Sequence, residues 1–206
     1  MVVLVLAPHT DDGEFGCGGT IAHLVGDGNQ VFYAAFSCAE KSVPQEFPSH
    51  ILREEVGRAT AALGILPGRV FVFGYPVREF PKYRQDILDG MIGLRDEITP
   101  DLVFLPSQFD IHQDHQVVHD EGLRAFKYGS ILGYELPWNN LSFSTTCFSC
   151  LSEKQVALKL AALAEYRSQA GRPYATEERI RSLMVLRGSQ AGVPFAEAFE
   201  VIRWLL

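Results

Sequence analysis

Residues 1–20 read MVVLVLAPHTDDGEFGCGGT, and this stretch decides the fold. Its apolar segment, residues 2–7, predicts a first strand that is buried on both faces, as strands of parallel sheets are. The segment has no basic flank and is too short for the apolar core of a signal peptide, so we interpret it as part of the fold. The glycine-rich residues 16–19 predict a tight turn that leads into an apolar helix. Their spacing differs from G-x-G-x-x-G, which argues against a dinucleotide site.

Short β-branched or aromatic runs then alternate with segments of helical periodicity, a pattern typical of parallel βαβ units. No internal repeat or linker divides the chain. We therefore expect one domain over residues 1–206, an α/β, Rossmann-like, mostly parallel sheet with helices on both faces. The predicted strands are 2–7, 31–37, 70–75, 102–106 and 131–136, and the predicted helices are 18–25, 50–63, 84–98, 116–126, 152–168 and 176–187.

The composition is that of an ordinary globular protein, with 206 residues, 47% hydrophobic and 21% charged. A net charge of -7 argues against nucleic acid as the main partner, because phosphate backbones are bound by clustered Lys and Arg. No apolar run reaches the roughly 18 to 20 residues of a membrane-spanning helix. We expect a cytoplasmic protein.

The four cysteines do not form a disulfide framework. Cys147 and Cys150 make a single C-x-x-C, and Cys17 and Cys38 do not supply the second pair that a structural zinc site needs. We expect all four to be reduced and packed, without a chemical role.

Two acidic-histidine clusters, His9–Asp12 and His112–His115, lie in different halves of the chain. Each follows a predicted strand, and open α/β sheets bind ligands beyond the carboxyl ends of their strands, so we expect the clusters to converge. A zinc hydrolase needs three protein ligands and an open position for water. His9, Asp12 and His115 can provide those three ligands.

Asp11 and His112 remain beside this ligand set. Adjacent carboxylates on an irregular turn can diverge, one toward a metal and one toward its water, which makes Asp11 the candidate general base. His112 lies three positions before His115 and is expected to face the same pocket. With Asp114 or Asp110 fixing its tautomer and favouring its protonated form, His112 would stabilise an oxyanion or protonate a leaving amine.

Either cluster alone has an ordinary explanation. A lone Asp-Asp pair is usually a solvated turn or a helix cap, and acidic-histidine loops also occur on ordinary surfaces. Their joint occurrence at two strand ends is what favours a functional site. The other histidines, His23, His50 and His119, are explained by packing, capping or exposure.

The motifs around both clusters resemble those of the LmbE/PIG-L family of zinc-dependent N-deacetylases. That family opens with a strand followed by A-H-P-D-D-E and G-C-G-G and later carries P-x-x-D-x-H-x-D-H; the counterparts here are residues 7–14, 16–19 and 106–115. Thr10 and Gly13 stand where the family usually has proline and glutamate, and neither departure alters a proposed ligand or base. Weaker matches extend the resemblance over nearly the whole chain, at residues 53–55, 61–64, 166–169 and 196–199.

The resemblance implies the same zinc ligands and the same general base as those proposed above. It also implies that His112, assisted by Asp114, stabilises the tetrahedral intermediate, and that Arg53 contacts the substrate or its oxyanion. We therefore expect a zinc-dependent hydrolase that removes the N-acetyl group from an N-acetylglucosamine-type sugar or sugar conjugate, giving acetate and a free amine. Two histidines and a carboxylate also describe an Fe(II) site, so Fe²⁺ or another divalent metal stays open.

Three alternatives remain. In the first, the chain hydrolyses another amide, a formamide or a phosphoester with the same metal. In the second, it binds a sugar or nucleotide without turnover. In the third, it holds Mg²⁺ for phosphotransfer. A binding module has no need of the spare Asp11 and His112, and the phosphotransfer site leaves the second cluster idle.

Three loops, 39–48, 76–83 and 137–146, are expected to decide which sugar conjugate binds. Trp138 either stacks on a sugar ring or packs against the protein. Aromatic residues around Phe143 would mark a subunit contact of a homo-oligomer or belong to the core.

Overall fold

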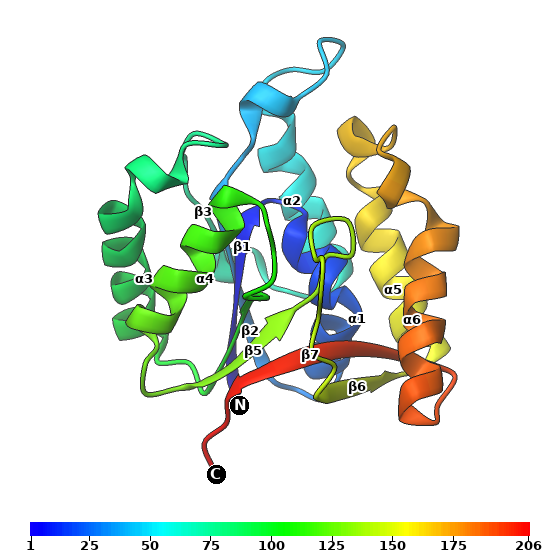
Figure 1. Cartoon of the computed structure of the whole chain (residues 1–206). Coiled ribbons are helices and arrows are strands. Elements are labelled where there is room, and N and C mark those ends of the chain that lie inside the picture. The colour runs from blue at the N-terminus through cyan, green and yellow to red at the C-terminus, as the bar shows by residue number, and fades with distance from the viewer.

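The structure, a computed structural model, describes all residues from 1 to 206. Its centre is one seven-stranded sheet with the order β3-β2-β1-β4-β5-β7-β6 (Figure 1). The first five strands along the chain pair in parallel, and β7 pairs antiparallel with both β5 and β6. The strands are β1 (Val2–His9), β2 (Gln30–Ser37), β3 (Val70–Val72), β4 (Leu102–Pro106), β5 (Ser130–Tyr134), β6 (Cys147–Leu151) and β7 (Phe195–Arg203).

Six helices cover the two faces of the sheet, with α3 and α4 on one face and the other four on the opposite face (Figure 1). Strand β1 shows why both faces are covered. Val3 and Val5 belong to one buried cluster, and Leu4 and Leu6 belong to the other. The predicted α/β fold with helices on both faces is confirmed. The helices are α1 (Asp12–Gly26), α2 (Ile51–Ala62), α3 (Arg84–Ile98), α4 (Gln113–Ala125), α5 (Glu153–Ala164) and α6 (Glu177–Ala191).

The two antiparallel strands, β6 and β7, are absent from the elements that the sequence predicts. Two glutamates, Glu197 and Glu200, interrupt the apolar pattern of β7, yet both are buried. Glu197 forms an ion pair with Lys159 at 2.6 Å, and Glu200 accepts a hydrogen bond from the Ser107 hydroxyl at 3.1 Å. Because these partners come from distant segments, no local pattern identifies the strand.

Helix α1 begins at Asp12, earlier than the predicted start at residue 18. Residues 16–19 therefore lie inside the helix, and in place of the predicted turn before the helix there is a break within it at Cys17. A Cβ atom at Gly16 would clash with the ring of Tyr134 on β5, so glycine here allows the helix to lie close to the sheet. The glycine run serves packing between helix and sheet.

Helix α1 is broken at Cys17, whose φ of -143° is not helical. The carboxylate of Glu197 accepts the backbone N–H groups of Gly19 at 2.9 Å and Thr20 at 2.7 Å, which satisfies donors that the break leaves free. Lys159 neutralises this buried carboxylate. The C-terminal strand thus fixes the helix that begins at Asp12, the last residue of the first acidic-histidine cluster.

No helix of the chain is long and apolar enough to cross a membrane. All four cysteines are free, and Cys147 and Cys150 both lie on β6. Residues three apart on a strand point to opposite faces, so these two do not form a shared site.

Candidate metal centre and active site

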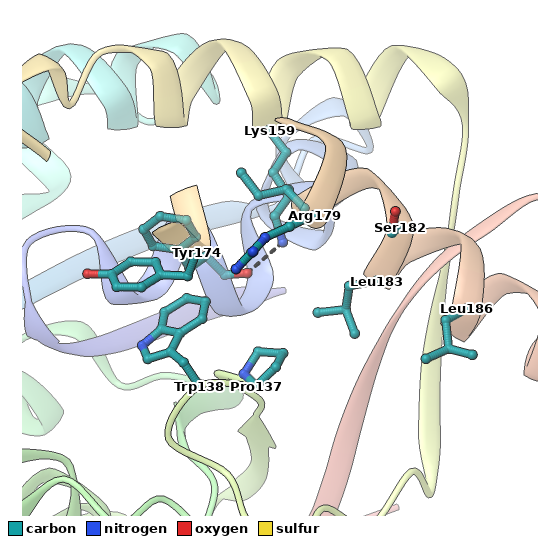
Figure 2. Close-up of a pocket in the computed structure, with 10 residues that line it drawn as sticks. Pro137, Trp138, Lys159, Tyr174, Arg179, Ser182, Leu183 and Leu186 are labelled. Carbon is teal, nitrogen blue, oxygen red and sulfur yellow. Dashed lines mark hydrogen bonds between the residues drawn. The ribbon is translucent and has the colours of Figure 1, made fainter. Parts of the chain in front are cut away.

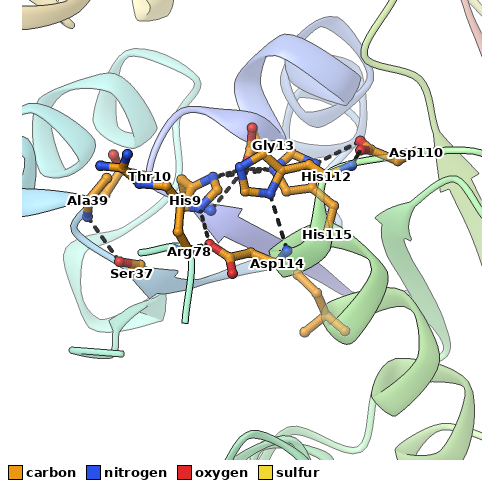
Figure 3. A network of polar contacts seen from close by, with 12 residues as sticks. His9, Thr10, Gly13, Ser37, Ala39, Arg78, Asp110, His112, Asp114 and His115 are labelled. Carbon is orange, nitrogen blue, oxygen red and sulfur yellow. Dashed lines mark hydrogen bonds and ion pairs between the residues drawn. The ribbon is translucent and has the colours of Figure 1, made fainter. Parts of the chain in front are cut away.

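The two acidic-histidine clusters meet at one edge of the sheet. Strands β1 and β4 are parallel neighbours, so their carboxyl ends lie side by side. The first cluster joins the end of β1, at His9, to the start of α1, and the second joins β4 to α4, with His112 as the N-terminal cap of that helix. The chain leaves β1 toward β2 on one side and reaches β4 on the other, so this edge is the switch point of the sheet. The two clusters therefore lie together in the structure, as expected (Figure 3).

Three side-chain atoms form a near-equilateral triangle at this edge. His9 Nδ1 lies 3.1 Å from Asp12 Oδ2 and 3.2 Å from His115 Nε2, and Asp12 Oδ2 lies 3.2 Å from His115 Nε2. Bond lengths of 2.0–2.1 Å in a tetrahedral zinc site place neighbouring ligand atoms about 3.3 Å apart. The three atoms are therefore spaced as ligands of one small divalent metal.

Two further carboxylates orient the imidazoles of this triangle. Asp110 Oδ2 lies 2.7 Å from His115 Nδ1, and Asp114 Oδ2 lies 3.1 Å from His9 Nε2. A carboxylate accepts the proton of the nitrogen that faces it, so in the neutral form of each ring the lone pair is on the nitrogen inside the triangle. Carboxylate partners behind metal-binding histidines are a common arrangement in metal sites.

His112 is the third histidine whose ring nitrogen lies within 4.8 Å of the other two, so three imidazoles are a second conceivable donor set. The backbone N–H of Asp114 donates to His112 Nδ1 at 3.2 Å. A neutral His112 therefore carries its proton on Nε2 and offers a hydrogen-bond donor there rather than a lone pair. This favours Asp12 over His112 as the third ligand.

The partner of Asp114 differs from the one that the sequence predicts. Its carboxylate contacts His9, and only its backbone N–H contacts His112. Burial, followed by the charges of His115 and His9, lowers the pKa of His112 to about 4, so its protonated form is disfavoured in this structure. The geometry presents His112 as a neutral hydrogen-bond donor.

The electrostatics of the triangle favour a cation. Burial by itself lowers the pKa of His9, but the charge of Asp12 and the hydrogen bonds to Asp114 and Asp12 outweigh it and raise the pKa to about 9. The pKa of His115 rises to about 10 against the same desolvation, through Asp12 and Asp110. The two imidazoles in turn hold the pKa of the Asp12 carboxyl well below its usual range, although burial opposes this. Positive charge is stabilised here, and a divalent cation is one group that would supply it.

Asp11 is half-buried at the start of α1 and lines the same cavity as the triangle. Burial, and next the neighbouring charge of Asp12, raises the pKa of Asp11 to about 6. A carboxylate with a pKa near neutrality is suited to take up and return a proton. The predicted general base is thus beside the predicted ligands.

The cavity that holds these groups has a volume of about 320 Å³. Besides the two clusters, its walls come from three loops and the segment after α5, at Ala39, Ser42, Val77, Arg78, Trp138, Asn139, Gln169, Arg172 and Tyr174. Residues of all three loops that the sequence singles out, 39–48, 76–83 and 137–146, are among them.

A second cavity of about 440 Å³ adjoins the first, and Trp138 and Tyr174 line both (Figure 2). The two rings stack with centroids 4.1 Å apart and an interplanar angle of 15°. The larger cavity has mainly apolar walls and contains none of the predicted ligands, so the smaller cavity is the chemical centre.

Arg53 does not line the cavity. Its side chain is exposed, and its Nη1 donates to the backbone carbonyl of Val72 at 3.4 Å. Arg78 and Arg172 line the cavity instead. Neither arginine belongs to a motif that the sequence analysis identified. Arg78 lies in the loop 76–83, which was expected to contact the substrate, and this was the only indication of its role.

Comparisons with known proteins identify the family of this chain. The family described as PIG-L, GlcNAc-PI de-N-acetylase, matches residues 4–126, which include both clusters. The uncharacterized deacetylase YaiS of Escherichia coli (strain K12) is 28% identical over 172 residues, covering 81% of this chain and 90% of YaiS.

Two solved structures share the fold. The N,N'-diacetylchitobiose deacetylase from Pyrococcus horikoshii, complexed with its inhibitor MPG, superposes with a TM-score of 0.83 at 23% identity, over 98% of this chain and 83% of that chain. GalB, a 4-carboxy-2-hydroxymuconate hydratase from Pseudomonas putida KT2440, has a TM-score of 0.78 at 18% identity, over 100% and 97%. The fold therefore carries more than one reaction, and only the site can decide between them.

The family match spans more than half of the chain and takes in His9, Asp12 and His115, and on the ground of its extent this protein belongs to the PIG-L family of de-N-acetylases.

Proposed function

We propose that this chain is a metal-dependent deacetylase that hydrolyses the acetamido group of an N-acetylglucosamine-type sugar or sugar conjugate. The products are acetate and a free amine. One observation carries the proposal, namely that His9 Nδ1, Asp12 Oδ2 and His115 Nε2 lie 3.1 to 3.2 Å from one another in the cavity that Asp11 also lines.

His9, Asp12 and His115 would hold the metal. When bound, a divalent cation supplies a Lewis acid that makes water more acidic and polarises a carbonyl oxygen. Asp110 and Asp114 keep the two imidazoles in the tautomer that binding requires.

Asp11 moves the proton. Its carboxylate takes a proton from the attacking water as the new C–O bond forms at the amide carbon, and it returns that proton to the nitrogen as the C–N bond breaks. His112 donates a hydrogen bond from Nε2 to the oxygen on which negative charge develops. Attack by water and departure of the amine therefore need only one proton shuttle, and the acetic acid that forms releases its remaining proton to solvent as acetate.

Zinc is the proposed metal, since the ligand set of two histidines and one carboxylate with an open position is typical of zinc hydrolases. The same set also suits Fe²⁺. Reconstituting the metal-free protein with each ion, under anaerobic conditions for Fe²⁺, and comparing turnover tests this choice.

The sugar class is supported by the description of the matching family, which names a GlcNAc conjugate, and by the chitobiose deacetylase of the same fold. Two aromatic rings, Trp138 and Tyr174, line the cavity and offer apolar faces to a sugar ring.

The deciding experiment measures acetate released from N-acetylglucosamine and N,N'-diacetylchitobiose by the zinc-reconstituted protein and by Asp11→Asn. The variant should retain metal and lose at least about 100-fold in kcat, because general acid–base catalysis contributes a factor of this size. Asp27→Asn, which removes an exposed carboxylate, is the matched control and should behave as the parent. Near-full turnover by Asp11→Asn with unchanged metal content would refute the assigned base. Release of formate or phosphate from other substrates, with no acetate from any N-acetyl sugar, would refute the reaction.

A further inference from the structure

Arg78 has a backbone conformation that arginine rarely adopts. Its φ is +68°, and Ala39 and Thr99 are the other non-glycine residues with positive φ. Glycine would take this conformation without strain, whereas a bulky side chain there is destabilising. Strained residues of this kind gather at functional sites, and Arg78 lines the cavity of the metal triangle.

The strained loop is held by the same carboxylate that orients a proposed metal ligand. Asp114 Oδ2 accepts the backbone N–H of Arg78 at 2.5 Å, and Oδ1 accepts that of Phe80 at 3.2 Å. The Oδ2 atom also faces His9 Nε2. Asp114 therefore ties the backbone of Arg78 to His9 of the triangle.

Arg172 reaches the cavity from a different segment and is also held in place. Its Nε donates to Gln169 Oε1 at 3.2 Å. Gln169 is 7% exposed and donates to the hydroxyl of Ser168 at 3.1 Å, and that hydroxyl donates to the buried carboxylate of Glu55 at 2.6 Å. A chain of buried polar groups thus orients a guanidinium at the cavity wall.

Neither guanidinium is neutralised by the protein. Arg78 and Arg172 form no ion pair, whereas other arginines such as Arg181 and Arg187 pair with carboxylates at 2.6 Å. Asp11 and Asp12 also line the cavity, and the chain carries a net charge of -7, so these two unpaired guanidinium groups are the cationic side chains left free to attract an anionic group of a ligand.

We infer that Arg78 and Arg172 form an anion subsite of the metal cavity, so that the N-acetylated sugar substrate carries a phosphate or carboxylate group, an inference that rests on the proposed function. The guanidinium fork matches both anions, since each presents two oxygens to parallel N–H donors. The uncharged part of the sugar would then lie between the subsite and the metal triangle.

The test compares kcat/KM of the zinc-reconstituted protein for N-acetylglucosamine, N-acetylglucosamine 1-phosphate and N-acetylmuramic acid. The parent should prefer at least one of the two charged sugars, and which of them it prefers identifies the anion. In Arg78→Gly and in Arg172→Gln, the ratio of kcat/KM for that charged sugar over the neutral sugar should fall about 10- to 100-fold, the loss expected for one charged hydrogen-bonding partner. The change should be in KM, because the anion is bound before and during the reaction alike.

Thermal unfolding shows whether Arg78 acts in substrate recognition or in stabilising the fold. Arg78→Gly should keep the melting temperature of the parent or raise it by about 1 to 4 °C, because strain is relieved while the charge is lost. Thr99→Gly is the matched control, since it relieves the same kind of strain at the end of α3 and should leave the selectivity ratio unchanged.

Equal kcat/KM for charged and neutral sugars in the parent would overturn the subsite and leave the deacetylase proposal intact. A lower melting temperature with equal loss of both activities in Arg78→Gly would assign Arg78 a structural role and also overturn it. Calorimetric binding of N-acetylglucosamine 1-phosphate to zinc-reconstituted Asp11→Asn tests the subsite without turnover. If no sugar releases acetate, the proposed reaction fails. The subsite is still tested by binding of N-acetylglucosamine 1-phosphate to Asp11→Asn, and by the loss of this binding when Arg78→Gly is added to that variant.

Discussion

Replacing Asp110 by asparagine should weaken metal binding, because Asp110 sets the tautomer of His115. One of its oxygens lies 2.7 Å from His115 Nδ1, and the other accepts the backbone N–H of His112 at 2.9 Å. Asparagine offers only one acceptor oxygen. If that oxygen stays on His115, the amide NH₂ faces the N–H of His112, and two donors oppose each other. If the amide flips, His115 must carry its proton on Nε2, where the lone pair for the metal is needed.

Either arrangement carries a similar cost. An unsatisfied buried donor costs about 1–3 kcal/mol, and loss of a carboxylate behind a metal-binding histidine lowers affinity about 10- to 100-fold, equivalent to roughly 1.4–2.7 kcal/mol. We predict this loss in zinc affinity for Asp110→Asn, measured by competition with a chelating indicator at fixed pH. Asp27→Asn, at an exposed position, should show the affinity of the parent. An Asp110→Asn protein that binds zinc as tightly as the parent would refute the assignment of the His115 tautomer.

Two further predictions concern stability. Burial raises the pKa of Glu14 to about 8 although Tyr33 and Tyr166 hydrogen-bond to it, so in the metal-free protein the folded state keeps a proton that the unfolded state loses above about pH 4.5. Parent stability should therefore fall as pH rises from about 5 to 8, and urea unfolding of Glu14→Gln should show a flatter profile over this window; equal slopes would contradict the assignment. Glu197→Gln should destabilise the chain by about 3–5 kcal/mol in the same assay, because it leaves the buried ammonium of Lys159 without a counter-charge, and a loss below about 1 kcal/mol would show that the pair does not hold the fold.

The parallel half of the sheet follows from the sequence because its strands are apolar at nearly every position. β1 and β4 need cover on both faces, and their burial is complete or nearly so along their length. The antiparallel half does not follow, because β7 contains Glu197 and Glu200, whose burial depends on partners far away in the chain. Local pattern therefore predicts the core strands and misses the strands whose charges are neutralised only in the folded state.

Part of the site could likewise be predicted from the sequence, and part could not. His9, Asp12 and His115 were predictable, because each stands in a short motif at a strand end, and parallel strands bring such ends together. The hydrogen-bond partner of Asp114 was not, since it depends on the angle at which α4 begins. For Arg78 the sequence indicated only the loop 76–83, because the place of this residue in the cavity depends on a strained backbone conformation that the residue pattern does not predict.

Elemental analysis shows directly whether His9 and Asp12 bind one metal ion together with the distant His115. The parent, His115→Ala and Asp11→Asn would each be reconstituted with zinc, passed through gel filtration and assayed for metal per chain. We predict about one zinc per chain in the parent and in Asp11→Asn, and much less than one in His115→Ala. A parent without zinc, or a His115→Ala protein that holds as much as the parent, would contradict it.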